Sequence, residues 1–205
     1  MKEDIVLIGG GGHCKSCIDV IESTQKFKIA GIIDNKNLHS RVLGYPILGT
    51  DADMPMIAKE YRNFLISIGQ IKSSGKRRVL FEKLKEIGAN FPVVISQNAY
   101  VSSHANIREG TIVMHHALIN SGATIGKNCI INSKALVEHD AHIGDHCHIS
   151  TSAVINGGVK IGCDTFIGSR VMTREYIEIG EKSFVGGGLT IFKNIQNNSF
   201  IKPTL

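Results

Sequence analysis

The chain has no tryptophan and only 4 prolines among its 205 residues, and aromatic residues make up 6% of it. With 22 glycines, this composition predicts many tight turns and little aromatic packing. No apolar run approaches the length needed to cross a membrane, and the apolar stretch before the first glycines is too short for a signal peptide. Apolar residues make up 42% of the chain and charged residues 20%. These values are typical of an ordinary soluble globular protein, so we expect no membrane insertion.

The 5 cysteines are an odd number and form no disulfide-like framework, so we expect reduced thiols and a cytoplasmic location. Cys14 and Cys17 form a C-x-x-C pair, a spacing found in redox and metal sites. They lie on an expected helix without a second pair elsewhere, so we interpret both as packing residues. Cys129 and Cys147 occupy small inward positions of the repeat described below and are expected in the core. Cys163 has no visible base beside it in the sequence, and we assign it no role.

The net charge of +5 suggests an anionic partner, which could be nucleic acid, anionic lipid or a phosphorylated small molecule. Lysine and arginine are scattered along the chain, and the one basic run covers residues 76–78. A nucleic-acid interface needs basic residues gathered on one face or element. We therefore expect no nucleic-acid partner.

The first part of the chain, residues 1–91, alternates short β-rich runs with helical ones. We predict strands at 4–9, 28–34 and 63–69 and helices at 13–24, 53–61 and 74–89. Asp53 is a favourable N-cap for the second of these helices. Alternating strands and helices are typical of a small, Rossmann-like parallel α/β sheet. Residues 1–91 are therefore predicted to form one α/β domain.

From residue 92 onward the apolar period changes to six. Counting in sixes from Ile95 to Ile191 gives seventeen positions, of which sixteen are Ile or Val and one is Thr173. Neither the helix period nor the strand period produces such a repeat over about a hundred residues, whereas a hexapeptide-repeat β-helix does. A small or medium-sized residue usually stands two places before the aliphatic, so that both can point inward. Residues 92–205 are therefore predicted to form an all-β domain of about five three-sided coils.

Four histidines lie within ten positions, at His139, His142, His146 and His148. Clustered imidazoles are typical of a metal site. The repeat, however, distributes these side chains around one coil. His142 and His148 each precede an inward Ile and should point outward from different faces, while His139 and His146 fall at corners. Because the side chains would not converge, we predict no metal, and solvated surface positions are the simplest interpretation of His142 and His146.

A run of four glycines, residues 9–12, separates the first predicted strand from the first helix. Free backbone N–H groups at such a helix N-terminus can hold an anion. The run does not match a dinucleotide fingerprint, because Cys14 stands where glycine is required. His13 follows the run, and Asp34 ends the second predicted strand. In a parallel sheet ligands collect at these strand ends, so Asp34 could accept a hydrogen bond from a base or ribose.

Four short motifs give the chain a resemblance to a known family over essentially its whole length. They are Gly11-Gly12-His13, Asp34-Asn35, Gly69 in "SIG" and Glu138-His139-Asp140. The chain resembles bacterial nucleotide-sugar acetyltransferases of the UDP-N-acetylbacillosamine N-acetyltransferase and sialic acid acetyltransferase type. The resemblance implies a left-handed parallel β-helix after the α/β domain, acetyl-CoA as co-substrate and a homotrimer. The sequence departs from the family at Asn35, where some relatives have Asp, and at its C-terminal end, "SFIKPTL".

The resemblance also implies roles for individual residues. His139 would be the general base and Asp140 its carboxylate partner, while His148, Ser169 and Gly187 would contact acetyl-CoA. The UDP part would be held by Gly11, Gly12, His13, Asp34, Asn35 and Gly69. The chemistry agrees with this assignment, because an imidazole can accept the proton that an attacking amine loses. A carboxylate on the other ring nitrogen fixes the tautomer and stabilises the imidazolium that forms.

We therefore expect acetyl transfer from acetyl-CoA to the amine, at C4, of a UDP-linked amino-dideoxy sugar in bacterial surface-glycan or glycoprotein sugar biosynthesis. Two alternatives remain open. The first is O-acetylation of a sialic-acid-like sugar, and the second is a sugar-nucleotide-binding module without catalysis. Because His139 and His148 should lie on different faces of one prism, we expect each active site of the trimer to be shared between neighbouring chains.

Overall fold

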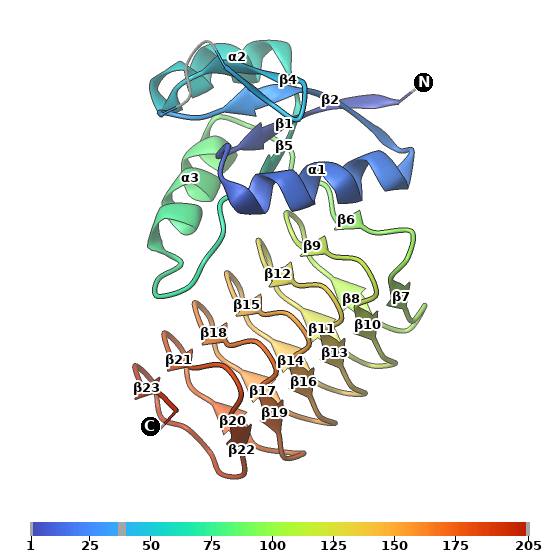
Figure 1. The fold of residues 1–205 in the computed structure, drawn as a ribbon, viewed down its shortest axis with the longest axis vertical. Coiled ribbons are helices and arrows are strands. Elements are labelled where there is room, and N and C mark those ends of the chain that lie inside the picture. The colour runs from blue at the N-terminus through green and yellow to red at the C-terminus, as the bar shows by residue number, and fades with distance from the viewer. Residues whose placement is uncertain (1, 37–39, 204–205) are drawn as a thin grey trace.

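The computed structural model describes residues 2–36 and 40–203, which form an α/β part followed by a β-helix (Figure 1). The strands of the α/β part are β1 (Glu3–Ile8), β2 (Phe27–Ile33), β3 (Arg41–Val42), β4 (Tyr45–Gly49) and β5 (Asn63–Ile66). They form one sheet in the order β3-β4-β2-β1-β5. Neighbouring strands run parallel, except that β3 is antiparallel to β4. The predicted parallel α/β sheet is therefore confirmed.

Three α-helices cover the two faces of this sheet: α1 (Gly12–Thr24), α2 (Met54–Glu60) and α3 (Gly75–Glu86), with a 3-10 helix, η1 (Asp51–Asp53), before α2. Alternate residues of β1 point to opposite faces. Ile5 and Leu7 pack with α1 residues, whereas Val6 and Ile8 pack with residues of α2 and α3. Because both faces are covered, the buried part of β1, residues 5–8, is an uninterrupted apolar run.

No element is predicted for the stretch that forms β3 and β4, and the predicted strand 63–69 is longer than β5. β4 is short, but Ile47 pairs with Ile32 of β2, so its place is decided by a neighbouring strand. β5 ends at Ile66 instead of residue 69, and directly after it the Ser67 hydroxyl lies 3.0 and 2.8 Å from the carbonyl oxygens of Ile8 and Gly9, either of which can accept its proton. The shorter strand leaves Gly69 in the loop beyond the carboxyl end of β5.

The rest of the chain forms a left-handed parallel β-helix with three sheets. The domain-facing sheet contains β6 (Val94–Ile95), β9 (Ile112–Val113), β12 (Ile130–Ile131), β15 (His148–Ile149), β18 (Phe166–Ile167), β21 (Phe184–Val185) and β23 (Phe200–Ile201). The apolar sheet contains β7 (Tyr100–Val101), β10 (Leu118–Ile119), β13 (Leu136–Val137), β16 (Val154–Ile155), β19 (Met172–Thr173) and β22 (Thr190–Ile191). The polar sheet contains β8 (Asn106–Ile107), β11 (Thr124–Ile125), β14 (His142–Ile143), β17 (Lys160–Ile161) and β20 (Glu178–Ile179).

The interior of the prism is filled as the repeat predicts. The aliphatic positions from Val113 to Ile191 are buried, and Thr173, the exception in the repeat, is 1% exposed. Cys129 and Cys147 are fully buried in the same core, so their predicted packing role is confirmed. Tight corners separate the strands, and many corner residues have left-handed backbone conformations.

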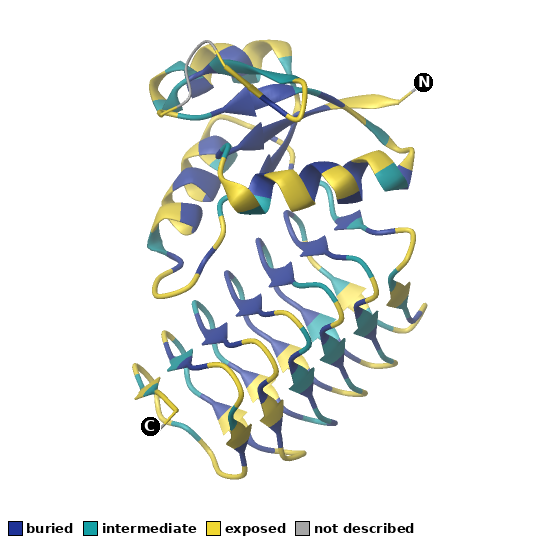
Figure 2. Ribbon diagram, viewed as in Figure 1, coloured by how far each residue is buried: buried dark blue, intermediate teal, exposed yellow. Residues whose placement is uncertain are grey.

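The α/β part packs on the domain-facing sheet, with α1 lying across the first coils (Figures 1 and 2). Cys14 and Cys17 of α1 are fully buried in a cluster that also includes Val94, Ile112 and Ile130 from that sheet. Both cysteines are therefore packing residues, as predicted. Since α3 ends at Glu86 and β6 begins at Val94, we propose a domain boundary between residues 91 and 92. No helix in the described ranges is long and apolar enough to span a membrane.

Candidate active site

The N-terminal end of α1 faces open space. The helix begins at Gly12 with no side-chain cap at Gly11 and no acidic residue in its first turn. A Cβ atom built on either glycine would meet nothing within 4 Å. The free N–H groups and the positive end of the helix dipole are therefore available to an anion such as a phosphate.

Two predicted substrate residues, Asp34 and Asn35, are held at the end of β2. Asp34 accepts hydrogen bonds from the Gly10 N–H at 2.6 Å and from the Lys36 N–H at 2.8 Å, which ties the glycine turn to β2. Asn35 donates to Asp51 Oδ2 at 2.7 Å and accepts from the Asp51 N–H at 2.8 Å. No sequence signal marks Asp51, because its pairing with Asn35 depends on η1 lying beside the end of β2. Asp51 thus joins this edge of the sheet.

His13 lies at the junction of the α/β part and the β-helix, close to two other predicted site residues. A Cβ atom on Gly69 would lie 3.4 Å from the Cβ of His13, and the rings of His13 and His148 are 6.4 Å apart at their centroids. Burial, with the nearby Arg77 and His148, lowers the pKa of His13 to about 3. Its buried Nε2 has no hydrogen-bond partner within the described part of the chain. His13 is therefore neutral at pH 7.

His148 points outward from β15, as predicted, but the α/β part covers it and leaves it 6% exposed. Its Nδ1 donates to the Gln70 carbonyl at 2.7 Å, and its Nε2 accepts from Asn132 Nδ2 at 3.0 Å. Burial lowers the pKa of His148 to about 4, so this ring is also neutral. Sequence reasoning missed Gln70, although it directly follows the Gly69 that the resemblance identifies.

The other two residues predicted to contact acetyl-CoA lie beside His148 at the corner that follows the domain-facing sheet. Ser169 Oγ is 2.9 Å from the hydroxyl of Ser150, which directly follows β15. Gly187 is stacked one coil further on, where a Cβ atom would lie 3.0 Å from the Ser169 carbonyl oxygen. Both Ser169 and Gly187 are exposed. His148, Ser169 and Gly187 therefore follow one another on three successive coils, at or just after β15, β18 and β21.

His139 and Asp140 form a hydrogen-bonded pair at the corner between the apolar and polar sheets. His139 Nδ1 is 2.9 Å from Asp140 Oδ2. Glu138 Oε2 accepts from the backbone N–H of His139 at 3.2 Å and from Asn120 Nδ2 at 2.8 Å. The His139 ring lies over Gly157 of the next coil, where a Cβ atom would be 2.5 Å from Nε2. The His139 ring thus packs against the next coil, while the pair remains open to solvent.

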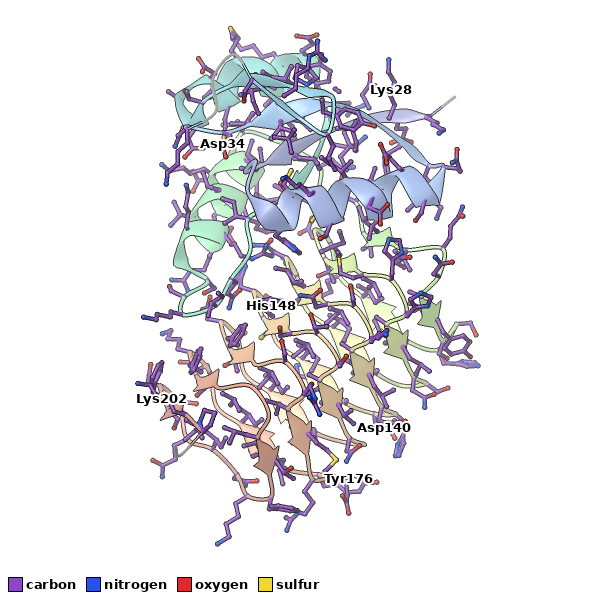
Figure 3. All side chains as sticks on the ribbon, viewed as in Figure 1. Lys28, Asp34, Asp140, His148, Tyr176 and Lys202 are labelled. Carbon is purple, nitrogen blue, oxygen red and sulfur yellow. The ribbon has the colours of Figure 1, made fainter. Side chains whose placement is uncertain are left out.

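The predicted site residues fall into two separate groups within one chain. His13, Gly69 and His148 lie close together where the α/β part packs on the domain-facing sheet. His139 and Asp140 lie at the corner between the apolar and polar sheets. Figure 3 labels His148 at the domain junction and Asp140 far from it on the β-helix. One chain therefore does not bring the acid–base pair to the predicted nucleotide-binding edge.

The prediction for His146 is wrong, and that for His142 is confirmed. His142 is exposed, and its Nδ1 lies 2.6 Å from Thr124 Oγ1. His146 is only 7% exposed, because α3 covers its corner: the ring meets the edge of Phe81 at 5.7 Å, and Nδ1 is 3.1 Å from Asn128 Nδ2. Across residues 2–36 and 40–203, no three His, Cys, Asp or Glu side chains are arranged to hold a metal ion.

Family models match both parts of the chain. The PglD N-terminal domain matches residues 4–84. The bacterial transferase hexapeptide model, with six repeats, matches residues 122–157, and the hexapeptide repeat of succinyl-transferase matches residues 158–193. A sequence comparison with curated proteins gives no match.

Solved structures resemble the chain over nearly its whole length. A histidine-to-asparagine variant of perosamine N-acetyltransferase from Caulobacter crescentus, in complex with CoA and GDP-perosamine, is 28% identical with a TM-score of 0.92, covering 98% of this chain and 93% of that one. The acetyltransferase domain of PglB from Neisseria gonorrhoeae, in complex with acetyl coenzyme A, is 26% identical with a TM-score of 0.92, covering 99% and 97%. WeeI from Acinetobacter baumannii shares the fold, at 24% identity and a TM-score of 0.84, covering 97% and 96%.

The chain belongs to the hexapeptide-repeat nucleotide-sugar acetyltransferases. The family predicted from the sequence is thus confirmed. The chain is therefore an enzyme, an acetyl-CoA-dependent acetyltransferase, and the alternative of a non-catalytic binding module is removed.

Proposed function

We propose that this acetyltransferase moves an acetyl group from acetyl-CoA to the C4 amine of a UDP-linked amino-dideoxy sugar used for bacterial surface glycans or glycoproteins. The observation that carries the proposal is the hydrogen-bonded pair of His139 and Asp140, solvent-accessible at a corner of an acetyltransferase β-helix. The open N-terminus of α1 supports a diphosphate at the other site. Relatives that bind CoA and GDP-perosamine support the amine of a nucleotide sugar as acceptor.

His139 is the proposed general base. With Nδ1 hydrogen-bonded to Asp140, its Nε2 is left to accept the proton of the amine. The amine nitrogen forms a bond to the acetyl carbon while the carbon–sulfur bond of the thioester breaks. The proton passes from the amine to His139 and on to the leaving thiolate. No covalent enzyme intermediate is needed, because amine and thioester can react directly once they are held together.

His148, Ser169 and Gly187 form the proposed acetyl-CoA strip. Both ring nitrogens of His148 are engaged by Gln70 and Asn132, so His148 would shape this strip through its ring rather than by donating a hydrogen bond to the co-substrate. Ser169 and Gly187, which are exposed, would provide the direct contacts.

A homotrimer with shared sites is part of the proposal. The outer face of the apolar sheet carries aligned apolar side chains, namely Tyr100, Leu118, Leu136, Val154 and Met172. Tyr100 is 60% exposed and Met172 43% exposed in the single chain, so this face suits burial against another copy. His139 borders the same face. Heterologous contacts close into a ring when the rotation between neighbouring copies is one third of a turn, and such a ring would place His139 of one chain at the acetyl-CoA strip of the next.

A thiol-release assay tests the reaction. The enzyme is mixed with acetyl-CoA and, in separate reactions, a UDP-linked 4-amino sugar, its GDP-linked equivalent and free sialic acid. The proposal requires the fastest release with the UDP-linked amine and a product that resists hydroxylamine, as an amide does. A preference for the GDP-linked sugar, the kind of nucleotide sugar bound in the Caulobacter crescentus structure, would overturn the proposed nucleotide. A hydroxylamine-sensitive ester of sialic acid would instead establish O-acetylation.

A further inference from the structure

Arg77 of α3 is an arginine buried without a carboxylate. It is 1% exposed, and no Asp or Glu of the described ranges forms an ion pair with it. Burial lowers its pKa to about 10, so the guanidinium stays charged at pH 7. Taking such a charge out of water is costly, and an apolar side chain of similar size would usually pack there at lower cost. The residue therefore needs an explanation beyond filling space.

The hydrogen bonds of Arg77 join two separate parts of the molecule. One guanidinium nitrogen donates to the carbonyls of Ile66 at 3.2 Å and Ile68 at 2.7 Å, at the carboxyl end of β5. The other donates to the carbonyl and to the side-chain oxygen of Asn128, at 2.7 and 2.9 Å. Asn128 lies at a β-helix corner between β11 and β12, in a left-handed conformation with φ of 50°. A single planar group thus fixes the end of β5 to the β-helix.

The segment that Arg77 holds, residues 66–70, is tied to the β-helix a second time. The Gln70 carbonyl accepts the hydrogen bond from His148. Between the two ties stands Gly69, which packs against His13 at the proposed nucleotide-sugar site. The segment therefore connects the proposed nucleotide-sugar site with the strip proposed for acetyl-CoA.

The rest of α3 provides a comparison for Arg77. Three other side chains of this helix contact corners of the β-helix: Arg78 pairs with Asp164 at 2.6 Å, Glu82 approaches His146 at 3.7 Å and Lys85 pairs with Glu109 at 2.7 Å. These contacts attach the helix to the β-helix. Only Arg77 also binds the backbone of residues 66–68.

We infer that Arg77 is a positioning residue that fixes the distance between residues 66–70 and the β-helix. This distance in turn fixes where the nucleotide sugar lies relative to the acyl donor. This inference rests on the proposed function. The side chain touches neither substrate and acts through Gly69 and Gln70. Small displacements of bound reactants reduce rates by about 100-fold, so a shift of this segment should affect turnover far more than stability.

The test compares Arg77→Lys with Arg78→Lys, an identical change one residue away. Lysine keeps the charge but cannot reach the acceptors on both sides at once. Arg77→Lys should lower kcat/KM for the nucleotide sugar by about 10- to 100-fold while KM for acetyl-CoA stays within about twofold. Hydrogen exchange of residues 66–70 should accelerate. Arg78→Lys should match the wild type in kinetics and exchange, since the Arg78 side chain is 46% exposed and a lysine there can keep the ion pair with Asp164.

A wild-type kcat/KM with wild-type exchange in Arg77→Lys would overturn the inference. If that variant does not fold, Asn128→Gly tests the same joint from the β-helix side, because it removes one acceptor and suits the left-handed backbone. It should show the same kinetic signature at smaller amplitude, and wild-type kinetics in this variant would count against the inference. If the wild-type enzyme acetylates no nucleotide sugar, the proposed function fails, and exchange at residues 66–70 alone decides the role of Arg77.

Discussion

His139 Nδ1 and Asp140 Oδ2 lie 2.9 Å apart although the two residues are adjacent in the chain. Neighbouring side chains on a strand point to opposite faces. Asp140 instead occupies a corner with φ of 58°, which lets its carboxylate reach the ring of the preceding residue. The side chains of His139 and Asp140 are 52% and 70% exposed in the single chain. A neighbouring chain can therefore approach this pair without any rearrangement of the coil.

Replacing His139 with alanine should lower kcat by roughly 10²–10⁴, the usual range for loss of a general base. The fold should persist, because this exposed corner side chain contributes little to the core. Thiol release measures the rate, and thermal unfolding checks the fold. His142→Ala is a matched control, since His142 is also exposed and lies three residues further on the same coil. Near-normal turnover by folded His139→Ala would remove this residue from the mechanism.

Replacing Asp140 with asparagine should have a smaller effect, a loss of about 10- to 100-fold in kcat. His139 can still accept a proton, but it loses the carboxylate that orients the ring and stabilises the imidazolium. The same thiol-release assay measures the loss. A loss in Asp140→Asn as large as that in His139→Ala would show that the two residues act as an inseparable unit.

Replacing Gly157 with alanine should displace the catalytic ring without unfolding the protein. The new Cβ would lie 2.5 Å from His139 Nε2, and Gly157 is not among the described glycines with positive φ. We expect kcat to fall by about 10-fold or more because the base is misplaced. The melting temperature should change by only a few degrees, since the exposed ring can swing away. Unchanged turnover would contradict the prediction, because it would show that the reaction does not need the His139 ring in its position over Gly157.

Acid should destabilise the joint between the two parts of the chain. The pKa values of His13 and His148 are lowered from 6.5 to about 3 and about 4, so the unfolded chain binds more protons than the folded one. Their contribution to stability is complete above about pH 6.5 and is lost as the pH falls towards 4. For each histidine, lowering the pH by one unit within that window lowers the free energy of unfolding by about 1.4 kcal/mol. Urea unfolding between pH 7.5 and 5 measures the slope.

The variant His148→Asn separates this effect from general acid sensitivity. Asparagine retains a donor for the Gln70 carbonyl but does not titrate. The dependence of unfolding free energy on pH should therefore be shallower in the variant than in the wild type. An identical slope would mean that His148 is protonated in the folded protein as readily as in the unfolded chain.

Active sites shared between chains should permit complementation. Light scattering should give three times the chain mass of 22.3 kDa. Inactive His139→Ala chains mixed with inactive Gly187→Asp chains, after joint unfolding and refolding, should recover activity at about a quarter of the sites if mixing is random. Neither variant refolded alone should be active. An active monomer, or a mixture without activity, would contradict shared sites.

The β-helix and its inward positions follow from the sequence, because the direction of a side chain in a hexapeptide coil depends on its place in the repeat. The same local rule places His142 and His148 on outer faces and His139 at a corner. The strand–helix alternation likewise predicts three strands of the α/β sheet and all three α-helices. The sequence does not predict β3 or β4, because β3 is only 2 residues long and β4 takes its place in the sheet from its pairing with β2.

By itself the sequence determined the two folds, the core of the prism and the adjacent residues His139 and Asp140, since each depends on local period or immediate neighbours. Only the tertiary structure decided which outward residues are covered. It buried His148 beneath the Gln70 loop and His146 beneath α3, and it joined Asn35 to Asp51. The physical reason is that burial and hydrogen bonding at these positions come from segments distant in the chain, whose approach no local periodicity encodes.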